Sequence, residues 1–349
     1  MTRQTWTAVA SALIFVLAAT LIAFVPIPFV AWTPGLTYDL LGAGSDGKPL
    51  VRVEGVETYP TKGELRLTTV SQTRADSNLS LPEAMLNYLL PKRDVLPRSA
   101  VYDAGKTPVQ VADEEKQLMS TAQSQAVVAA LRAADQPVRE LPMVTSVRIS
   151  GPSNDKLEPG DLITSVDNSS VLSSADVVDR IRAKGVGQKV VLGVLRGSAP
   201  MSVTIDTVGA SSDGRVATIG VTIGTGYSYG PTVTYAIDPA IGGGSGGLIF
   251  SLAIYDKITP DSLIDGRNIA GTGTIDASGR VGPIGAIQEK IAGAEAEGAT
   301  VFLVPESNCT DTVGVSTHMR LVKVTTLYDA ITSLRSLDDP SKDAQVPRC

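Results

Sequence analysis

The stretch GGGSGGLIFSLAIYDKI, residues 242–258, sets one serine between glycines at the start of an apolar helical run. The strand-like segment TVTYAI, residues 232–237, comes shortly before it. A serine at a helix N-terminus is exposed on a turn whose free backbone N–H groups can stabilise an oxyanion. The pattern therefore predicts Ser245 as a nucleophile, with Gly244 and Gly246 shaping its turn.

Two other interpretations of this stretch are open. A serine in a glycine-rich turn is usually only a helix cap. The same glycines also satisfy GxGxxG, and Asp265 lies near the distance at which a dinucleotide fold carries its acidic residue. In that fold the acidic residue ends the second strand, whereas Asp265 precedes the next strand-like stretch, residues 268–275. We therefore disfavour dinucleotide binding.

The composition excludes several classes of site. The 349 residues carry 30 basic and 36 acidic side chains, and a net charge of −6 gives no footprint for nucleic acid. His318 is the single histidine, so a multi-histidine metal site is impossible. Residues 42–49 imitate a P-loop, but Pro49 replaces the hydroxyl that binds Mg²⁺. We expect no cofactor and no metal.

Because the chain has only one histidine, a lysine is the candidate for the base that a nucleophilic serine needs. Residues 284–298, IGAIQEKIAGAEAEG, read as a helix in which Lys290 shares one face with Ile287, Ile291 and Ala294. Burial on this apolar face disfavours the ammonium form, and a lysine with a depressed pKa can deprotonate serine. The alternative is a lysine that extends its charged end to solvent.

Ser245, Lys290 and their neighbours resemble one protease family. Residues 241–305 are similar to the proteolytic domain of Lon proteases, through GGGSGG and through IAGTGTIDASGRVGPIGAIQEKIAGAEAEGATVFLVP. The resemblance implies a Ser-Lys dyad, with Ser245 as nucleophile and Lys290 as base, and it implies that Thr272 helps to position the lysine. It also makes a homo-oligomeric ring an expectation.

Two positions depart from the Lon pattern. Gly242 stands three residues before the serine, where Lon has an acidic residue, and the TGE of the family reads Thr272-Gly273-Thr274. Either other residues supply these polar groups or the activity is weak. Nothing in the chain resembles the Lon ATPase module, so we expect cleavage without ATP and therefore of unfolded or extended segments.

Residues from Leu141 to about Val208 resemble a PDZ domain. Two segments show this resemblance: LEPGDLI at 157–163 and Val166-Asp167-Asn168. Together they resemble the turn and strand of PDZ domains attached to bacterial proteases. Such a domain binds an extended peptide as an added strand. We place the groove between residues 143–147 and a helix at 174–184, and no GLGF-type carboxylate loop is evident. A sheet that merely packs is the alternative.

The N-terminus predicts a membrane anchor. Residues 8–25, AVASALIFVLAATLIAFV, are apolar or small throughout, and no charge occurs between Arg3 and Asp39. A cleaved signal peptide is the competitor, but prolines and Trp32 occupy the place of an A-x-A cleavage site. Arg3 favours a cytoplasmic N-terminus, with the catalytic part on the extracytoplasmic side of the cell membrane.

Between the anchor and the PDZ region, residues 50–54 and 64–70 alternate as strands around a turn at 60–63 and predict a β-hairpin. Residues 73–111 read as irregular, with one short helical stretch near 82–90, and residues 112–134 predict a long helix with an acidic first turn. The hairpin and this helix resemble the opening of the Lon domain. The PDZ domain is then an insertion in one discontinuous protease domain, the alternative being separate modules in sequence.

The predicted fold is α+β: a transmembrane helix and a Lon-type protease domain with an inserted PDZ domain of small sheet plus helices. The boundaries are 1–7 cytoplasmic, 8–32 anchor, 33–137 first protease part, 138–210 PDZ, 211–337 second protease part and 338–349 tail.

The predicted function is that of a membrane-tethered, ATP-independent serine endopeptidase acting on protein or peptide substrates, with the PDZ domain for substrate capture or gating. The alternative is a non-catalytic PDZ scaffold on an inactive Lon-like fold. In an oxidising compartment Cys309 and Cys349 can form a disulfide that holds the tail, and two free thiols are the alternative.

Overall fold

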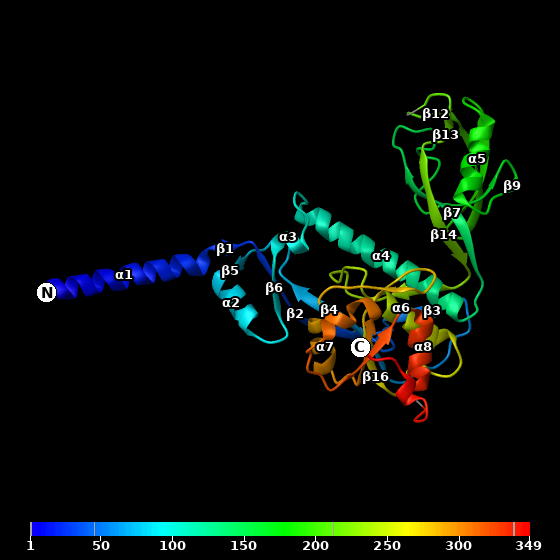
Figure 1. Ribbon diagram of the computed structural model, residues 1–349. Coiled ribbons are helices and arrows are strands. Elements are labelled where there is room, and N and C mark those ends of the chain that lie inside the picture. The colour runs from blue at the N-terminus through cyan, green and yellow to red at the C-terminus, as the bar shows by residue number, and fades with distance from the viewer. Residues whose placement is uncertain (1, 45, 212, 338) are drawn as a thin grey trace. The chain divides into compact units, whose positions relative to one another are not determined.

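The computed structural model describes residues 2–44, 46–211, 213–337 and 339–349 (Figure 1). The chain divides into two compact units, one formed by Met1–Asp135 with Pro231–Cys349 and the other by Gln136–Gly230. Ser45 of the P-loop-like stretch, Ser212 beside a predicted boundary and Asp338 at the start of the predicted tail lie outside the described residues. The predicted mixture of helices and strands is confirmed.

The first helix, α1 (Arg3–Phe24), is long and apolar enough to cross a membrane and has no buried residue. It ends at Phe24, so the prediction of an anchor reaching residue 32 is wrong at its C-terminal end. Pro26 and Pro28 cannot continue a helix, and the residues after them favour strand. They form β1 (Pro26–Ile27) and the start of β2 (Phe29–Asp39).

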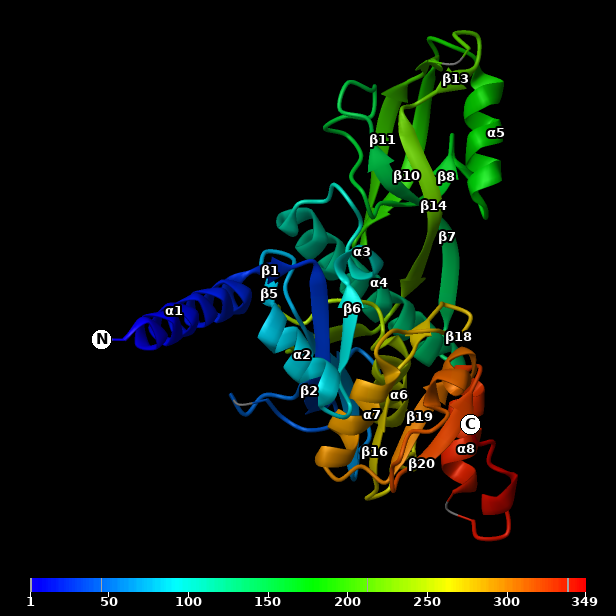
Figure 2. The ribbon, with the colours of Figure 1, turned by 60° about the vertical axis from the view of Figure 1, so that its left-hand side comes forward.

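The larger unit is built on a six-stranded mixed sheet. In spatial order its strands are β20 (Arg320–Val324), β19 (Val301–Pro305), β16 (Asn268–Gly271), β4 (Glu64–Gln72), β2 and β6 (Asp94–Pro97). The first four are parallel, and β2 runs antiparallel to both β4 and β6. Ala270 and Phe302 pack against helix α7 (Ile287–Ala296), whereas Gly271 approaches Ile249 of helix α6 (Gly247–Ile258). Helices therefore cover the two faces of the sheet (Figure 2).

The predicted hairpin of residues 50–54 and 64–70 is wrong. Strand β3 (Val51–Glu54) pairs with β15 (Thr232–Tyr235), which follows the smaller unit in the sequence. Strand β4 pairs instead with β2 and β16. Both edges of β4 are therefore occupied inside the main sheet, which leaves no edge for β3.

The long predicted helix is α4 (Pro108–Ala133), and it begins four residues earlier than the sequence indicated. Thr107 and Gln110 form a capping box, and Pro108 suits the first helical position. The acidic residues 113–115 consequently do not lie in the first turn, as the sequence had indicated. Helix α4 contacts α6 and α8 (Leu327–Ser336), and its buried residues lie in its second half.

The segment predicted as irregular contains short regular elements. These are β5 (Leu79–Ser80), α2 (Leu81–Leu89), β6 and α3 (Arg98–Val101). Strand β5 pairs with β1, directly after α1, and a capping box of Ser80 and Glu83 starts α2.

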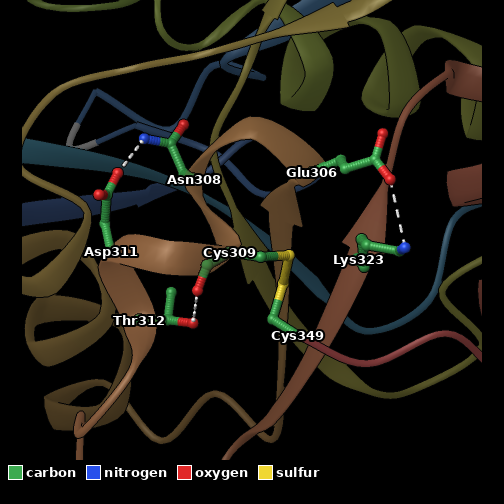
Figure 3. The surroundings of a disulfide bond; sticks show 7 residues. All are labelled: Glu306, Asn308, Cys309, Asp311, Thr312, Lys323 and Cys349. Carbon is green, nitrogen blue, oxygen red and sulfur yellow. Dashed lines mark hydrogen bonds and ion pairs between the residues drawn. A yellow bond between two sulfur atoms is a disulfide. The ribbon is translucent and has the colours of Figure 1, made fainter.

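The C-terminal tail is fixed to the same unit. Cys309, in the 3₁₀ helix Glu306–Thr312, forms a disulfide with Cys349 (Figure 3). The Lys323 N–H also donates to the Pro347 carbonyl at 3.1 Å, which adds the tail to the edge of β20.

The smaller unit is an antiparallel sheet with one helix on it. Its strands in spatial order are β11 (Ala199–Asp206), β10 (Lys189–Arg196), β8 (Leu162–Val166), β7 (Val138–Val147) and β14 (Val221–Tyr229). Helix α5 (Ser174–Lys184) occupies the predicted residues and begins at a capping box of Ser173 and Asp176. Val177 and Ile181 of α5 are buried in the core of this unit.

Candidate active site

Gly243, Gly246 and Gly247, three of the glycines around Ser245, are required by backbone geometry or by close packing. Gly243 has a φ of +87°, which a residue with a side chain rarely adopts. A Cβ at Gly246 would lie 2.6 Å from Leu67 Cδ1, and one at Gly247 would lie 2.8 Å from Ile275 Cγ2. Gly244, in contrast, has no atom closer than 3.7 Å to such a Cβ. The sequence thus forces a tight turn just before α6.

Lys290 is positioned by helix α7, which begins at Ile287 rather than at 284 as predicted. Ala286 caps it in the left-handed conformation, with a φ of +58°. The four residues predicted to share a face, Ile287, Lys290, Ile291 and Ala294, are all buried. Lys290 is only 3% exposed, because its side chain runs along the apolar face and ends inside the unit.

Ser245, Lys290 and Thr272 lie together at one point. Lys290 Nζ donates to Ser245 Oγ at 2.9 Å and to Thr272 Oγ1 at 3.3 Å. Thr272 Oγ1, which is fully buried, donates to the Ser245 carbonyl at 3.0 Å. The Gly273 N–H donates to the same carbonyl at 2.7 Å. Thr272 and Gly273, which directly follow β16, therefore fix both the serine turn and the lysine amine.

Burial sets the protonation of the lysine. It lowers the pKa of Lys290 from 10.5 to about 8, while the charge of Glu289 acts in the opposite direction. Glu289 is itself 1% exposed, and neither of its carboxylate oxygens has a hydrogen-bond partner among the described residues. Burial, reinforced by the charge of Asp94, raises the pKa of Glu289 to about 7. A neutral amine is accessible at near-neutral pH in this environment.

A cleft of about 600 Å³ opens onto the serine and the lysine. Its lining includes residues of β2 and β4, of α4 and of the turn 242–246. Within the described part of the chain, the backbone N–H groups of Ser245 and Gly246 donate to no protein acceptor. They are free to donate to a group bound in the cleft.

Glu115 is a cleft residue that the sequence did not reveal. Its backbone carbonyl accepts from the Gly243 N–H at 3.0 Å, and its side chain accepts from Gln72 Nε2 at 3.1 Å. A Cβ at Gly242 would lie 2.6 Å from Glu115 Cβ and 3.1 Å from its Oε2. Helix α4 thus brings a carboxylate next to the position where Gly242 departs from the Lon pattern. The only sequence signal was the acidic run 113–115.

Among residues 2–44, 46–211, 213–337 and 339–349, no group of three or more His, Cys, Asp or Glu side chains could hold a metal ion.

In the smaller unit, the strand predicted to form one side of the peptide groove, residues 143–147, is not at an edge of the sheet, so this prediction is wrong. Residues 143–147 belong to β7, which pairs with β14 on one side and, through Met143, with β8 on the other. The last strand of the sheet is β14, and no described strand pairs with its outer edge. Helix α5 contacts β14, and Ser174 Oγ donates to the Gly224 carbonyl at 3.2 Å.

A glycine in the left-handed conformation precedes β14, and the sequence analysis did not predict it. Gly220 precedes β14 with a φ of +75°, next to a hollow lined by Arg148, Gly151 and Thr218. The sequence Ile219-Gly220-Val221 could have suggested this turn, but it lies beyond the end of the predicted PDZ domain at residue 210.

Comparison with known proteins finds a match to one family in each unit, but the PDZ match begins within α4 of the larger unit and ends before β14. Residues 110–207 match the model of the PDZ domain, and residues 239–333 match that of the Lon protease (S16) C-terminal proteolytic domain. Lon protease 2 of Herpetosiphon aurantiacus is 36% identical over 78 residues, which are 22% of this chain and 9% of that protein. The chain therefore aligns with only a small part of this relative.

Two solved PDZ domains of SdrC-like proteins are similar to this chain. The one from Listeria monocytogenes is 30% identical over 24% of this chain and 85% of that chain, with a TM-score of 0.22. The one from Listeria innocua is 28% identical over 24% of this chain and 92% of that chain, with a TM-score of 0.23. The chain thus combines a PDZ domain with a proteolytic domain of the Lon (S16) family, as a distant relative of Lon protease 2.

Proposed function

We propose that this protein is a serine endopeptidase that uses Ser245 as nucleophile and Lys290 as general base. The observation that carries the proposal is the 2.9 Å contact between Lys290 Nζ and Ser245 Oγ. A buried lysine whose pKa is lowered to about 8 supports it, since only the neutral amine can accept a proton.

The reaction begins with the neutral amine of Lys290 accepting the proton of Ser245 as Oγ attacks a peptide carbonyl carbon. The resulting oxyanion accepts hydrogen bonds from the N–H groups of Ser245 and Gly246. The ammonium of Lys290 then gives its proton to the leaving amine. In the second half, the same lysine takes a proton from water as the water oxygen attacks the acyl carbon, and it then gives that proton to Oγ as the ester bond breaks, which restores the Ser245 hydroxyl and the neutral amine.

Thr272 is a positioning residue in this scheme. Its hydroxyl donates to the Ser245 carbonyl, so its oxygen lone pairs remain available to the Lys290 amine at 3.3 Å. This arrangement holds the amine toward Ser245 in both protonation states.

The PDZ unit binds an extended peptide along the outer edge of β14, beside α5. Unpaired strand edges accept an added strand through backbone hydrogen bonds. The side chain of Arg148, near Gly220 at the start of this edge, suits the carboxylate of a peptide terminus.

The unit Gln136–Gly230 is an insertion within one protease domain, since β3 and β4 pair with β15 and β16 from the other side of it. Helix α1 anchors the chain in the cell membrane, with the catalytic part outside the cytoplasm, where ATP is not available. The substrates are therefore unfolded or extended segments that need no motor.

A serine-reactive fluorophosphonate probe tests the dyad on the full chain in detergent or nanodiscs. Ser245→Ala should abolish labelling and peptidase activity, and Lys290→Ala and Lys290→Arg should abolish activity, since guanidinium is no base at neutral pH. Two matched controls should stay active: Ser251→Ala, a buried serine of the same helix α6, and Lys257→Ala, a lysine of α6 whose pKa burial also lowers.

Turnover of an unfolded protein by Lys290→Ala at the wild-type rate would refute the dyad. A wild type that neither reacts with the probe nor cleaves would instead favour a PDZ scaffold on an inactive fold.

A further inference from the structure

Helix α2 carries its large apolar side chains on the outside. Met85, Leu86, Tyr88 and Leu89 are 56%, 57%, 77% and 73% exposed. The buried residue of this helix is the small Ala84, which packs with Leu79 of β5 and with β2. An ordinary surface helix has the opposite arrangement, with its apolar stripe toward the core.

The exposed side chains form one continuous surface. At 100° per residue, positions 81, 82, 85, 86, 88 and 89 fill an arc of about 160°, and none of them is charged. Glu83 lies outside this arc, and its carboxylate is held by the Ser80 N–H and hydroxyl at 2.9 and 2.7 Å. Contiguous apolar surfaces of this kind usually mark a contact with another molecule or with a membrane. We call residues 81, 82, 85, 86, 88 and 89 the α2 face.

The place of α2 in the fold favours one occupant. Strand β1, which follows α1 after a single residue, pairs with β5, which leads directly into α2. Helix α1 also contacts α2, and both figures draw α2 beside the base of α1 (Figures 1 and 2). The register Pro26↔Ser80 and Ile27↔Leu79 therefore fixes the start of α2 next to the C-terminal end of the apolar helix.

The length of α1 sets the depth of that point. Its 22 residues rise about 33 Å, close to the thickness of the hydrocarbon core of a bilayer. Phe24 then lies at the boundary between hydrocarbon and headgroups. An apolar helix face at this level can enter the interface by several ångströms, with its polar side toward water.

We propose that the α2 face is seated in the outer leaflet of the same membrane that α1 spans, so that the protease unit has two membrane contacts instead of one. This inference rests on the membrane anchoring proposed above. The second contact fixes how the unit is oriented on the membrane, which one flexible tether would not do.

Spin-label accessibility tests this on the full chain in nanodiscs of phosphatidylcholine and phosphatidylglycerol. Because the native cysteines are joined to each other, a nitroxide reacts only with an introduced thiol. Leu86→Cys and Leu89→Cys probe the α2 face, Phe15→Cys probes α1, and Val313→Cys, an exposed apolar position 82% accessible, is the aqueous control. The measurement is the ratio of collision rates with oxygen and with a water-soluble nickel chelate.

The expected ratio at positions 86 and 89 is several-fold above that at 313 and below that at 15. If the ratios at 86 and 89 equal that at 313 while position 15 is lipid-exposed, the α2 face lies in water and the proposal is overturned, although the anchor stands. If position 15 is aqueous as well, the anchor itself fails. Protection from both reagents with dipolar broadening would mean that a second copy covers the α2 face, which also overturns the proposal.

Discussion

The pKa of Lys290 determines the pH range in which the proposed dyad can work. Burial lowers this pKa from 10.5 to about 8. At pH 7 a lysine with that pKa is neutral in roughly one molecule in ten, whereas an unshifted lysine is neutral in roughly one in 3,000. Burial therefore increases the population of the base roughly 300-fold.

Glu289→Gln is the perturbation that changes this pKa with the least change of shape. The buried carboxylate has a pKa raised to about 7, so it ionises in the range in which the lysine also titrates. Once ionised, it raises the pKa of Lys290 and reduces the neutral fraction. Glutamine removes that charge, so the pKa of Lys290 should fall and the pH–rate curve should move to lower pH.

The assay is kcat/KM for an unfolded protein substrate from about pH 6 to pH 10. The wild type should rise about tenfold per pH unit at low pH and level off near pH 8. The kcat/KM of Glu289→Gln should level off at lower pH than that of the wild type. The variant should exceed the wild type most between the inflection points of the two curves, and the two should have equal kcat/KM on the alkaline plateau. Glu297→Gln, at the C-terminal cap of the same helix and with a half-exposed side chain, is the matched control and should superimpose on the wild type.

An inflection in Glu289→Gln that is unchanged, or that moves to higher pH, would refute this account of the lysine. Stability gives a second check. The pKa of Glu289 is higher in the folded state than its usual 4.5, so its contribution to stability is full below pH 4.5 and is lost as pH rises through about 7. The melting temperature of Glu289→Gln, relative to that of the wild type, should therefore rise as the pH increases from 4.5 to about 7.

Three further changes have expected outcomes. Thr272→Val keeps the buried volume but removes a hydroxyl bonded to the dyad, so kcat should fall roughly tenfold while the melting curve changes little; an unaltered kcat would contradict a positioning role. Cys349→Ser opens a loop of 40 residues and should lower the free energy of unfolding by about 2–4 kcal/mol, measured by urea titration, with peptidase activity retained. A fragment of residues 212–349 lacks β2 and β4 and should be molten by near-UV circular dichroism, whereas residues 136–230 should unfold cooperatively; an active, cooperatively unfolding 212–349 fragment would rule out the insertion.

The features that could be predicted from the sequence are those that local periodicity determines. The spacing of apolar residues around Lys290 placed it on a buried face of α7. The helix at 174–184, expected from the resemblance to a PDZ domain, has the predicted bounds in α5. Burial on one face of a helix follows from positions three and four residues apart, which a sequence displays directly.

Strand partners could not be predicted in the same way. The alternation in residues 51–54 indicates a strand but carries no information about which edge it joins, and its partner β15 follows the smaller unit in the sequence. The same limit misplaced the groove, because β14, the strand that pairs with β7, lies far from it in the sequence. Glu115 was missed for a related reason, since tertiary packing alone brings α4 against the glycine turn.

The pairing of β7 with β14 begins at Val138 and Tyr229, so the chain leaves the smaller unit beside the point at which it entered. Lys62 and Ser262, 200 residues apart, must meet when the larger unit forms. If Gln136–Gly230 folds first, nearly half of the 200 residues between Lys62 and Ser262 are already ordered, so the entropy lost on closing the loop between them is smaller. The effective contact order of the larger unit then falls, and folding quickens. During synthesis, the smaller unit is complete before residues 231–349 emerge. Once folded, it holds the ends of the two segments of the larger unit, 1–135 and 231–349, close together.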